Sequence, residues 1–252
     1  QIDCFRNNCQ EAMDSIVAEL TEQSGSRLLV KEDLWPAPDF CNFGIRGDLS
    51  EFAGKRFAVP EDFDGQLQEV KLVDVAAQVM LRRMEEDPGI VVMGEDVHRL
   101  GGGTNGVTKG IVERFPDRIM GTPIAENAFV GLGGGIAMDG RFRPVVELMY
   151  ADFFWVAADQ IFNQIAKARH MYGGELEMPL VMRTKVAMGT GYGSQHSIDP
   201  AGVFAMSPGW RIVAPSNPFD YVGLMNSALA CKDPVLVLEH VDLYNTLGLV
   251  PV

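Results

Sequence analysis

Short apolar segments alternate with helical segments from Val70 to the end of the chain, and this alternation restricts the fold more than any other feature. Apolar residues three and four positions apart predict an amphipathic helix that begins near Leu72 and ends at residues 87–89, Asp-Pro-Gly. Residues 90–93 are wholly apolar, as in strands that lie between two helical layers. This alternation is typical of an α/β domain with a parallel sheet.

Later segments continue the same alternation. Strands are expected at residues 118–120, 144–149, 180–183, 211–213 and 235–239. Helices are expected at residues 107–115, 126–137, 152–170, 200–206 and 218–230. We therefore expect residues 66–252 to form one α/β domain.

Residues 1–65 differ from the rest of the chain. Apolar spacing predicts a helix at residues 11–20, and the three prolines and four glycines of residues 33–65 predict an extended, irregular arm. The arm has too many aromatic residues for a solvated linker, so we expect it to lie on another surface. These aromatic residues are Trp35, Phe40, Phe43, Phe52, Phe57 and Phe63.

The composition excludes several classes of function. A net charge of −13 argues against nucleic-acid binding, which usually requires a basic face, and against docking on an anionic membrane. No apolar run approaches the ~20 residues of a membrane-spanning helix. The four cysteines lack Cys-x-x-Cys spacing and are too sparse for a disulfide scaffold, so we expect reduced thiols and a cytoplasmic protein.

Glu126 is the principal candidate for a catalytic residue. It opens the helix expected at residues 126–137, directly after a strand that breaks at Gly121 and Pro123. Ligand contacts in open parallel sheets lie at such strand ends. The glycines inside this helix each cost about 1 kcal/mol relative to alanine, so they indicate a close helix crossing, either within one subunit or between two.

A second candidate, His196, ends the glycine-rich loop at residues 189–196. Glycines allow such a loop to approach a ligand, and a histidine can shuttle protons near neutral pH. The alternative is a structural or merely exposed loop histidine. The remaining histidines, His98, His170 and His240, show no metal-ligand spacing, so no zinc site is expected.

Residues 101–106 match the G-x-G-x-x-G pattern of dinucleotide-binding loops, and Glu126 follows twenty positions later. Residues 96–100 separate these glycines from the preceding strand, whereas the pattern places its first glycine in the turn itself. A surface loop is therefore the favoured interpretation, and a nicotinamide-dependent dehydrogenase is the less favoured alternative.

Ten short segments occur in the order and spacing of a known family. They are 94–97 (Gly-Glu-Asp-Val), 107–110 (Val-Thr-Lys-Gly), 122–126 (Thr-Pro-Ile-Ala-Glu), 143–147 (Arg-Pro-Val-Val-Glu), 151–153 (Ala-Asp-Phe), 159–160 (Asp-Gln), 195–197 (Gln-His-Ser), 208–209 (Pro-Gly), 213–216 (Val-Ala-Pro-Ser) and 233–234 (Asp-Pro). Through them, residues 72–244 resemble the beta subunit of thiamine-diphosphate-dependent 2-oxo acid dehydrogenases of the pyruvate, acetoin and branched-chain type. The resemblance implies a transketolase-like, pyrimidine-binding α/β domain.

The resemblance also implies roles for five residues. Glu126 would bond the ring nitrogen of the cofactor's aminopyrimidine, Ile124 and Met149 would line that ring, and Phe153 would stack on it. His196 would face the reacting carbon and serve in proton transfer or in acyl transfer to a lipoyl group.

The sequence departs from the family in two places. Ile198 and Asp199 follow Ser197, where the family continues His-Ser-Gln, and this departure concerns the handling of the lipoyl group. Cys231 stands where the family's potassium-binding loop has an acid, so no potassium ion is assigned.

Other parts of the family's active site must come from elsewhere. The family's alpha part holds the diphosphate through Mg²⁺ with a Gly-Asp-Gly segment, which this sequence lacks, so no metal site is assigned to this chain. We expect an alpha part in cis or in trans, a lipoyl-bearing acyltransferase core, a small 2-oxo acid substrate and further copies of the chain as partners. Residues 1–65 loosely resemble the tail of an alpha part, as expected for a piece of an alpha–beta fusion.

Two functional hypotheses follow. The first is the beta part of a decarboxylating 2-oxo acid dehydrogenase, which is inactive as this chain alone. The second is a catalytically inactive interaction module of the same fold.

Overall fold

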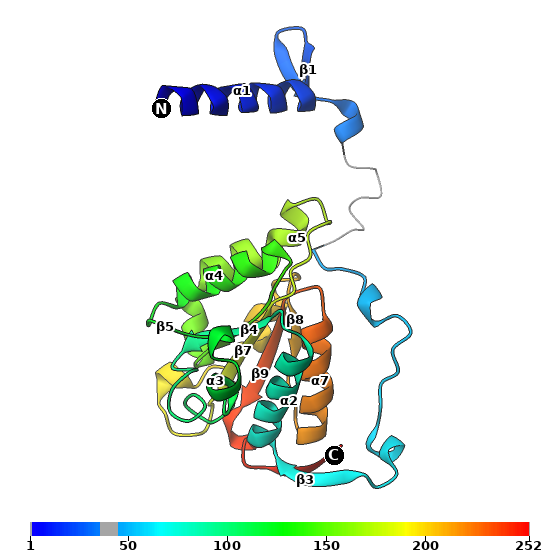
Figure 1. Cartoon of the computed structure of the whole chain (residues 1–252), viewed down its shortest axis with the longest axis vertical. Helices are drawn as coiled ribbons and strands as arrows, with labels where there is room; N and C mark the ends of the chain where they lie inside the picture. Colours follow the sequence, from blue (N-terminus) through cyan, green and yellow to red (C-terminus); the bar gives the residue numbers. More distant parts are fainter. Residues whose placement is uncertain (1, 36–44, 252) are drawn as a thin grey trace. The chain divides into compact units, whose positions relative to one another are not determined.

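The computed structural model describes residues 2–35 and 45–251, which form parts of two compact units, Gln1–Phe43 and Gly44–Val252 (Figure 1). Phe40, Phe43 and Cys41 lie outside the described residues. The division predicted after residue 65 stays a prediction. Within the described ranges, no helix is long and apolar enough to cross a membrane.

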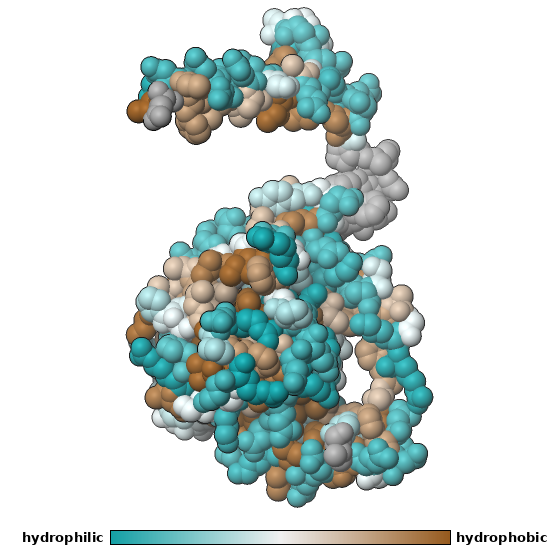
Figure 2. All heavy atoms as spheres, in the orientation of Figure 1, coloured by the Kyte–Doolittle hydropathy of each residue, from teal (hydrophilic) through white to brown (hydrophobic). Residues whose placement is uncertain are grey.

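The first unit contains helix α1, Ile2–Leu20, and a hairpin of two antiparallel strands, β1, Thr21–Ser24, and β2, Arg27–Val30. The predicted helix is confirmed and begins earlier than residue 11. None of this unit's described residues is buried. Figure 2 shows apolar side chains along one side of α1. Phe5 and Ile16 are among the exposed apolar residues of this helix.

The second unit is built on a six-stranded parallel sheet with the order β5-β4-β6-β7-β9-β8. The α/β fold with a parallel sheet is therefore confirmed. The strands are β4, Ile90–Glu95; β5, Ile119–Thr122; β6, Arg143–Leu148; β7, Val181–Val186; β8, Arg211–Val213; and β9, Val235–His240.

The sheet has a hydrophobic core on each face. Helices α2, Leu72–Glu86, and α7, Pro218–Ala230, lie side by side and cover one face, which Val92 and Val145 also line (Figure 1). Helix α4, Glu126–Asp139, covers the other face. Because successive strand residues point to opposite faces, both sets must be apolar, and this explains the uninterrupted apolar runs of the sequence. Three shorter helices complete the unit: α3, Ile111–Arg114; α5, Ala168–Met171; and α6, Ala201–Ala205.

The second unit also contains an antiparallel ribbon, which the sequence did not predict. It pairs β3, Leu67–Lys71, with β10, Leu247–Pro251. The ribbon continues directly into α2, where the Leu72 amide donates a hydrogen bond to the Thr246 carbonyl at 3.0 Å. The segment that enters the domain is therefore tied to the segment that follows its last parallel strand.

The helix predicted at residues 107–115 was wrong in extent. Residues 107–110 form turns, because Gly110 adopts a φ of 83°, outside the helical region, and α3 begins only at Ile111.

The continuous helix predicted at residues 152–170 was also wrong. The segment is a 3₁₀ turn, Ala151–Trp155, a π-helix, Asp159–Gln164, a second 3₁₀ turn, Ile165–Lys167, and then α5. The Ile165 amide donates to the carbonyls of both Gln160 and Ile161, and the Trp210 indole also donates a hydrogen bond to the Ile161 carbonyl, at 3.1 Å. A side chain that bonds to a helical carbonyl is a common cause of helix distortion.

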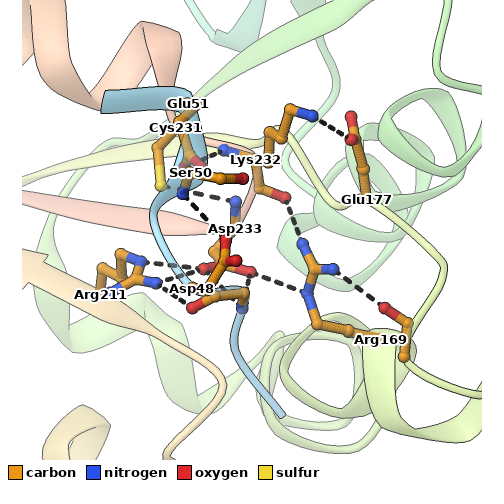
Figure 3. A network of polar contacts seen from close by, with 11 residues as sticks. Asp48, Ser50, Glu51, Arg169, Glu177, Arg211, Cys231, Lys232 and Asp233 are labelled. Atoms are coloured by element: carbon orange, nitrogen blue, oxygen red, sulfur yellow. Dashed lines mark hydrogen bonds and ion pairs between the residues drawn. The ribbon is translucent and has the colours of Figure 1, made fainter. Parts of the chain in front are cut away.

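The described part of the arm, from residue 45, belongs to the second unit and packs on the α/β domain through Asp233 (Figure 3). The side chain of Asp233 is 1% exposed, and it accepts hydrogen bonds from Arg169 Nε at 2.9 Å, Arg211 Nη2 at 2.6 Å and the Gly47 amide at 3.0 Å. The Lys232 amide donates to Glu51 Oε1 at 3.0 Å. These contacts fix the arm beside the connection between α7 and β9, and they confirm for these residues that the arm lies on another surface.

Candidate functional site

A cleft of about 760 Å³ opens at the carboxyl ends of strands β4, β5 and β6. The connections that follow these strands form its walls, together with the loop that contains His196. Open parallel sheets place ligands at this edge because the connections diverge there. The cleft is lined by Glu95, Asp96, His98, Arg99, Gly121, Thr122, Pro123, Ile124, Glu126, Met149, Phe153 and His196.

The structure brings all five residues selected from the sequence to this one cleft. Ile124 and Glu126 come from the connection between β5 and α4, Met149 and Phe153 follow β6, and His196 lies in the loop after β7. Their roles stay predictions, but their convergence from three separate connections is a property of the fold.

Glu126 is the first residue of α4 and is 6% exposed. At the amino end of a helix, unpaired backbone N–H groups and the helix dipole stabilise a negative charge. The cleft therefore contains a buried carboxyl group at the amino end of a helix, within reach of a bound ligand.

Glu95, which the sequence reasoning missed as an individual site residue, is the last residue of β4 and is 7% exposed. Burial, followed by the charges of Glu126 and Asp96, raises the pKa of Glu95 to about 7. Its place at the end of a buried strand, in the Gly-Glu-Asp segment, was the signal that could have identified it.

His196 is held by aromatic rings and by the backbone of its own loop. Its ring lies edge to face with Tyr150, with centroids 4.8 Å apart, and with Phe153, with centroids 5.4 Å apart. Asp152 accepts a hydrogen bond from the Ser197 amide at 3.2 Å. The short segment after β6 therefore contacts both the His196 ring and the backbone of the next residue.

Several buried polar atoms of the cleft have no hydrogen-bond partner among the residues that the structure describes. They are Glu95 Oε1, His98 Nδ1 and Thr122 Oγ1. Buried polar atoms are nearly always paired in proteins, and leaving one unpaired costs about 1–3 kcal/mol. Three such atoms in one cleft can be satisfied by ordered water or by a polar ligand.

A network of buried charges supports the sheet beside the cleft. Arg183 bridges Glu147, at 3.1 Å, and Glu239, at 2.7 Å, and Lys185 Nζ donates to Glu147 Oε1 at 2.9 Å. Although burial opposes it, the charges of Lys185 and Arg183 hold the pKa of Glu147 below its usual value. Glu147 is therefore a structural anion.

The glycine loop at residues 101–106 is attached to this network, because Lys185 Nζ also donates to Thr104 Oγ1 at 2.5 Å. None of residues 101–106 lines the cleft. The geometry therefore gives no support to a dinucleotide-binding role for this loop.

Cys231 is a buried thiol. Burial raises its pKa to about 11, so the thiol is neutral near pH 7, and its carbonyl accepts a hydrogen bond from Arg143 Nη1 at 3.1 Å. This residue offers no anionic oxygen to a cation. Within the described ranges, no group of three or more histidine, cysteine, aspartate or glutamate side chains could hold a metal ion.

Residues 68–246 match the family of the transketolase pyrimidine binding domain. The chain is 41% identical over 179 residues to the beta subunit of acetoin:2,6-dichlorophenolindophenol oxidoreductase of Cupriavidus necator, covering 68% of this chain and 53% of that subunit. It is 41% identical over 184 residues to the chloroplastic pyruvate dehydrogenase E1 component subunit beta-4 of Oryza sativa subsp. japonica, covering 73% of this chain and 46% of that subunit.

A third relative, the 2-oxoisovalerate dehydrogenase subunit beta of Bacillus subtilis, is 39% identical over 181 residues, covering 71% of this chain and 55% of that subunit. The chain thus spans about half the length of these relatives. Among solved structures, a split-gene transketolase described as an inactive beta4 tetramer has a similar fold, with a TM-score of 0.55 and 17% identity over 68% of this chain and 51% of that one.

Proposed function

From the premise that this chain belongs to the transketolase pyrimidine-binding family, and that its relatives are beta subunits of 2-oxo acid dehydrogenases, we propose that it supplies the pyrimidine half of a thiamine diphosphate site. A partner alpha part would hold the diphosphate and Mg²⁺. The complete enzyme would oxidatively decarboxylate a small 2-oxo acid and transfer the acyl group to a lipoyl group.

One observation carries this proposal: a single cleft, in which three buried polar atoms have no partner among the described residues, is lined by Ile124, Glu126, Met149, Phe153 and His196. The residues fit an aminopyrimidine. Apolar side chains can line the faces of a flat ring, and a carboxyl group can bond a ring nitrogen.

When bound, thiamine diphosphate supplies the nucleophilic carbon and the electron sink for decarboxylation. Glu126 would hold a proton at the ring nitrogen of the aminopyrimidine, as a carboxyl at the start of α4 can do. Glu95, next to it, would share that proton, because its raised pKa lets it be protonated or ionised near neutral pH. His196 would move a proton on the substrate side or assist the acyl transfer, held in place by Tyr150 and Phe153.

The cellular setting is part of the same proposal. Cys4 and Cys9 are exposed free thiols, which suits the reducing cytoplasm. We expect the functional protein to be an oligomer, because the exposed apolar side of α1 would be covered by association.

The test compares the chain alone with the chain combined with its diphosphate-binding alpha part. Calorimetric titration with thiamine diphosphate and Mg²⁺ should show binding only to the combination, and dye reduction should show turnover of pyruvate, 2-oxoisovalerate or acetoin only there. Robust turnover by the chain alone would contradict the half-site. An assembled complex that binds no cofactor would instead identify an inactive interaction module, and NAD binding by the chain alone would revive the dinucleotide alternative.

A further inference from the structure

His98 occupies a space that only a glycine at position 121 leaves open. A Cβ atom added to Gly121 would lie 1.8 Å from both Cε1 and Nδ1 of His98. Gly121 lies within strand β5 and does not have a positive φ, so its backbone does not itself require glycine. Glycine at position 121 therefore leaves room for the imidazole ring.

The hydrogen bond from Arg99 determines where the neutral His98 ring carries its proton. Arg99 Nε donates to His98 Nε2 at 3.2 Å. Because a guanidinium group has donors and no acceptor, Nε2 must be the unprotonated nitrogen, and the proton of the neutral ring lies on Nδ1.

The Nδ1–H group is thus a donor in need of an acceptor. Nδ1 is buried and has no partner among the described residues. His98 and Arg99 both line the cleft that contains Glu126. An unpaired donor beside a guanidinium group favours an acceptor that carries negative charge, since charge-assisted hydrogen bonds are about twice as strong as neutral ones.

We propose that His98 is a substrate-binding residue, whose Nδ1–H group donates a hydrogen bond to a carboxylate oxygen of the 2-oxo acid. This inference rests on the proposed function and adds a residue that the family's segments in this sequence do not assign. Arg99 fixes the ring tautomer, and Gly121 provides the room. A ring nitrogen of the cofactor would offer the same acceptor chemistry, so the test must separate substrate from cofactor.

The test uses the assembled enzyme with four changes: His98→Ala, Gly121→Ala, both together, and His98→Asn, whose amide can donate near the position of Nδ1. His170→Ala, an exposed histidine of α5, is the control. His98→Ala should raise KM for pyruvate or 2-oxoisovalerate roughly 10-fold, as the loss of one such hydrogen bond implies. Turnover at saturation and the dissociation constant of thiamine diphosphate should change less than about 2-fold.

Gly121→Ala should raise KM similarly, because the new methyl group displaces the ring, and the double variant should be no worse than either single one. His98→Asn should recover part of the lost affinity. An unchanged KM in His98→Ala would overturn the proposal, and so would a weakened cofactor affinity with an unchanged KM, since the acceptor would then belong to the cofactor.

A second readout separates this inference from the proposed function. In histidine-labelled protein, the Nδ1 signal of His98 should shift on titration with pyruvate, and His98→Ala should identify and remove that signal. If the wild-type assembly has no turnover, the proposed function fails. The pyruvate titration then still tests whether His98 binds a 2-oxo acid: a shifted Nδ1 signal supports this binding, and an unshifted signal contradicts it.

Discussion

Glu95 and Glu126 face the same cleft from the end of β4 and the start of α4, and the two carboxyl groups are coupled. Burial, and then the charge of Glu126, raises the pKa of Glu95 to about 7. Glu95 can therefore hold a proton near neutral pH, because burial and the neighbouring negative charge disfavour its ionisation. This arrangement suits a site that must keep a proton available to a bound ring.

Replacement of Glu95 by Gln should stabilise the protein at pH 8 and have little effect near pH 5. In the folded state the carboxyl keeps its proton up to about pH 7, whereas in the unfolded state it loses it near 4.5, so wild-type stability falls as pH rises between these values. Glutamine does not ionise, so the variant does not lose stability over this pH range. Because the group borders an open cleft, we expect a gain of about 1–2 kcal/mol rather than the full value of the shift.

Urea unfolding of both proteins at pH 5 and pH 8 measures this effect. A Glu95→Gln variant that is equally stabilised at the two pH values, or destabilised at pH 8, would show that Glu95 is not the titrating group.

Replacement of Asp233 by Asn should destabilise the second unit by about 3–5 kcal/mol. The change keeps the shape of the side chain but leaves Arg169 and Arg211 without the buried anion that they share. The arm should loosen as well, because the Gly47 amide binds the same carboxylate, and trypsin should then cut faster at Arg46.

The control for this change is Glu177→Gln, which breaks the ion pair with Lys232. Both side chains of that pair are more than 40% exposed, and exposed pairs contribute about 0–1 kcal/mol. Equal losses in the two variants would show that Asp233 does not act as a buried anchor.

Two neighbouring glycines of α4 should respond oppositely to alanine. A Cβ at Gly133 would lie 2.5 Å from Val146 Cγ2, so Gly133→Ala should destabilise by about 1–3 kcal/mol through overpacking against β6. No atom lies within 4 Å of a Cβ at Gly135, so Gly135→Ala should stabilise by up to about 1 kcal/mol through helix propensity. Denaturant unfolding of both variants measures the difference in stability. A loss of stability in Gly135→Ala would mean that another surface packs on α4 at Gly135.

These glycines illustrate how far the sequence could predict the structure. Their cost inside a helix correctly indicated a close crossing, but both an internal crossing and a subunit contact remained possible. The structure shows that Gly133 serves internal packing. Strands β4 to β9 and helices α2, α4 and α7 were predictable because periodicity and caps are local signals.

Contacts between distant segments were not predictable. The distorted segment at residues 151–171 contacts Trp210, which lies 49 positions away from the Ile161 carbonyl that it binds. Glu95 and His98 acquire their properties only when β4 and β5 pair, which brings Gly121 beneath the imidazole ring. The positions of Glu126 and His196 at the cleft, in contrast, could be predicted because motif and strand-end position coincided, and their roles stay predictions.

The most direct test of the central claim is the turnover of Glu126→Gln in the assembled enzyme, at saturating thiamine diphosphate and Mg²⁺. Glu113→Gln, at an exposed residue of α3, is the matched control, and circular dichroism should show that both variants keep the fold. We predict that Glu126→Gln lowers turnover by about 10²–10⁴-fold, as expected for the loss of an acid–base group, while Glu113→Gln stays near wild type. Near-normal turnover of Glu126→Gln would contradict the assignment of this cleft as the pyrimidine half of the site.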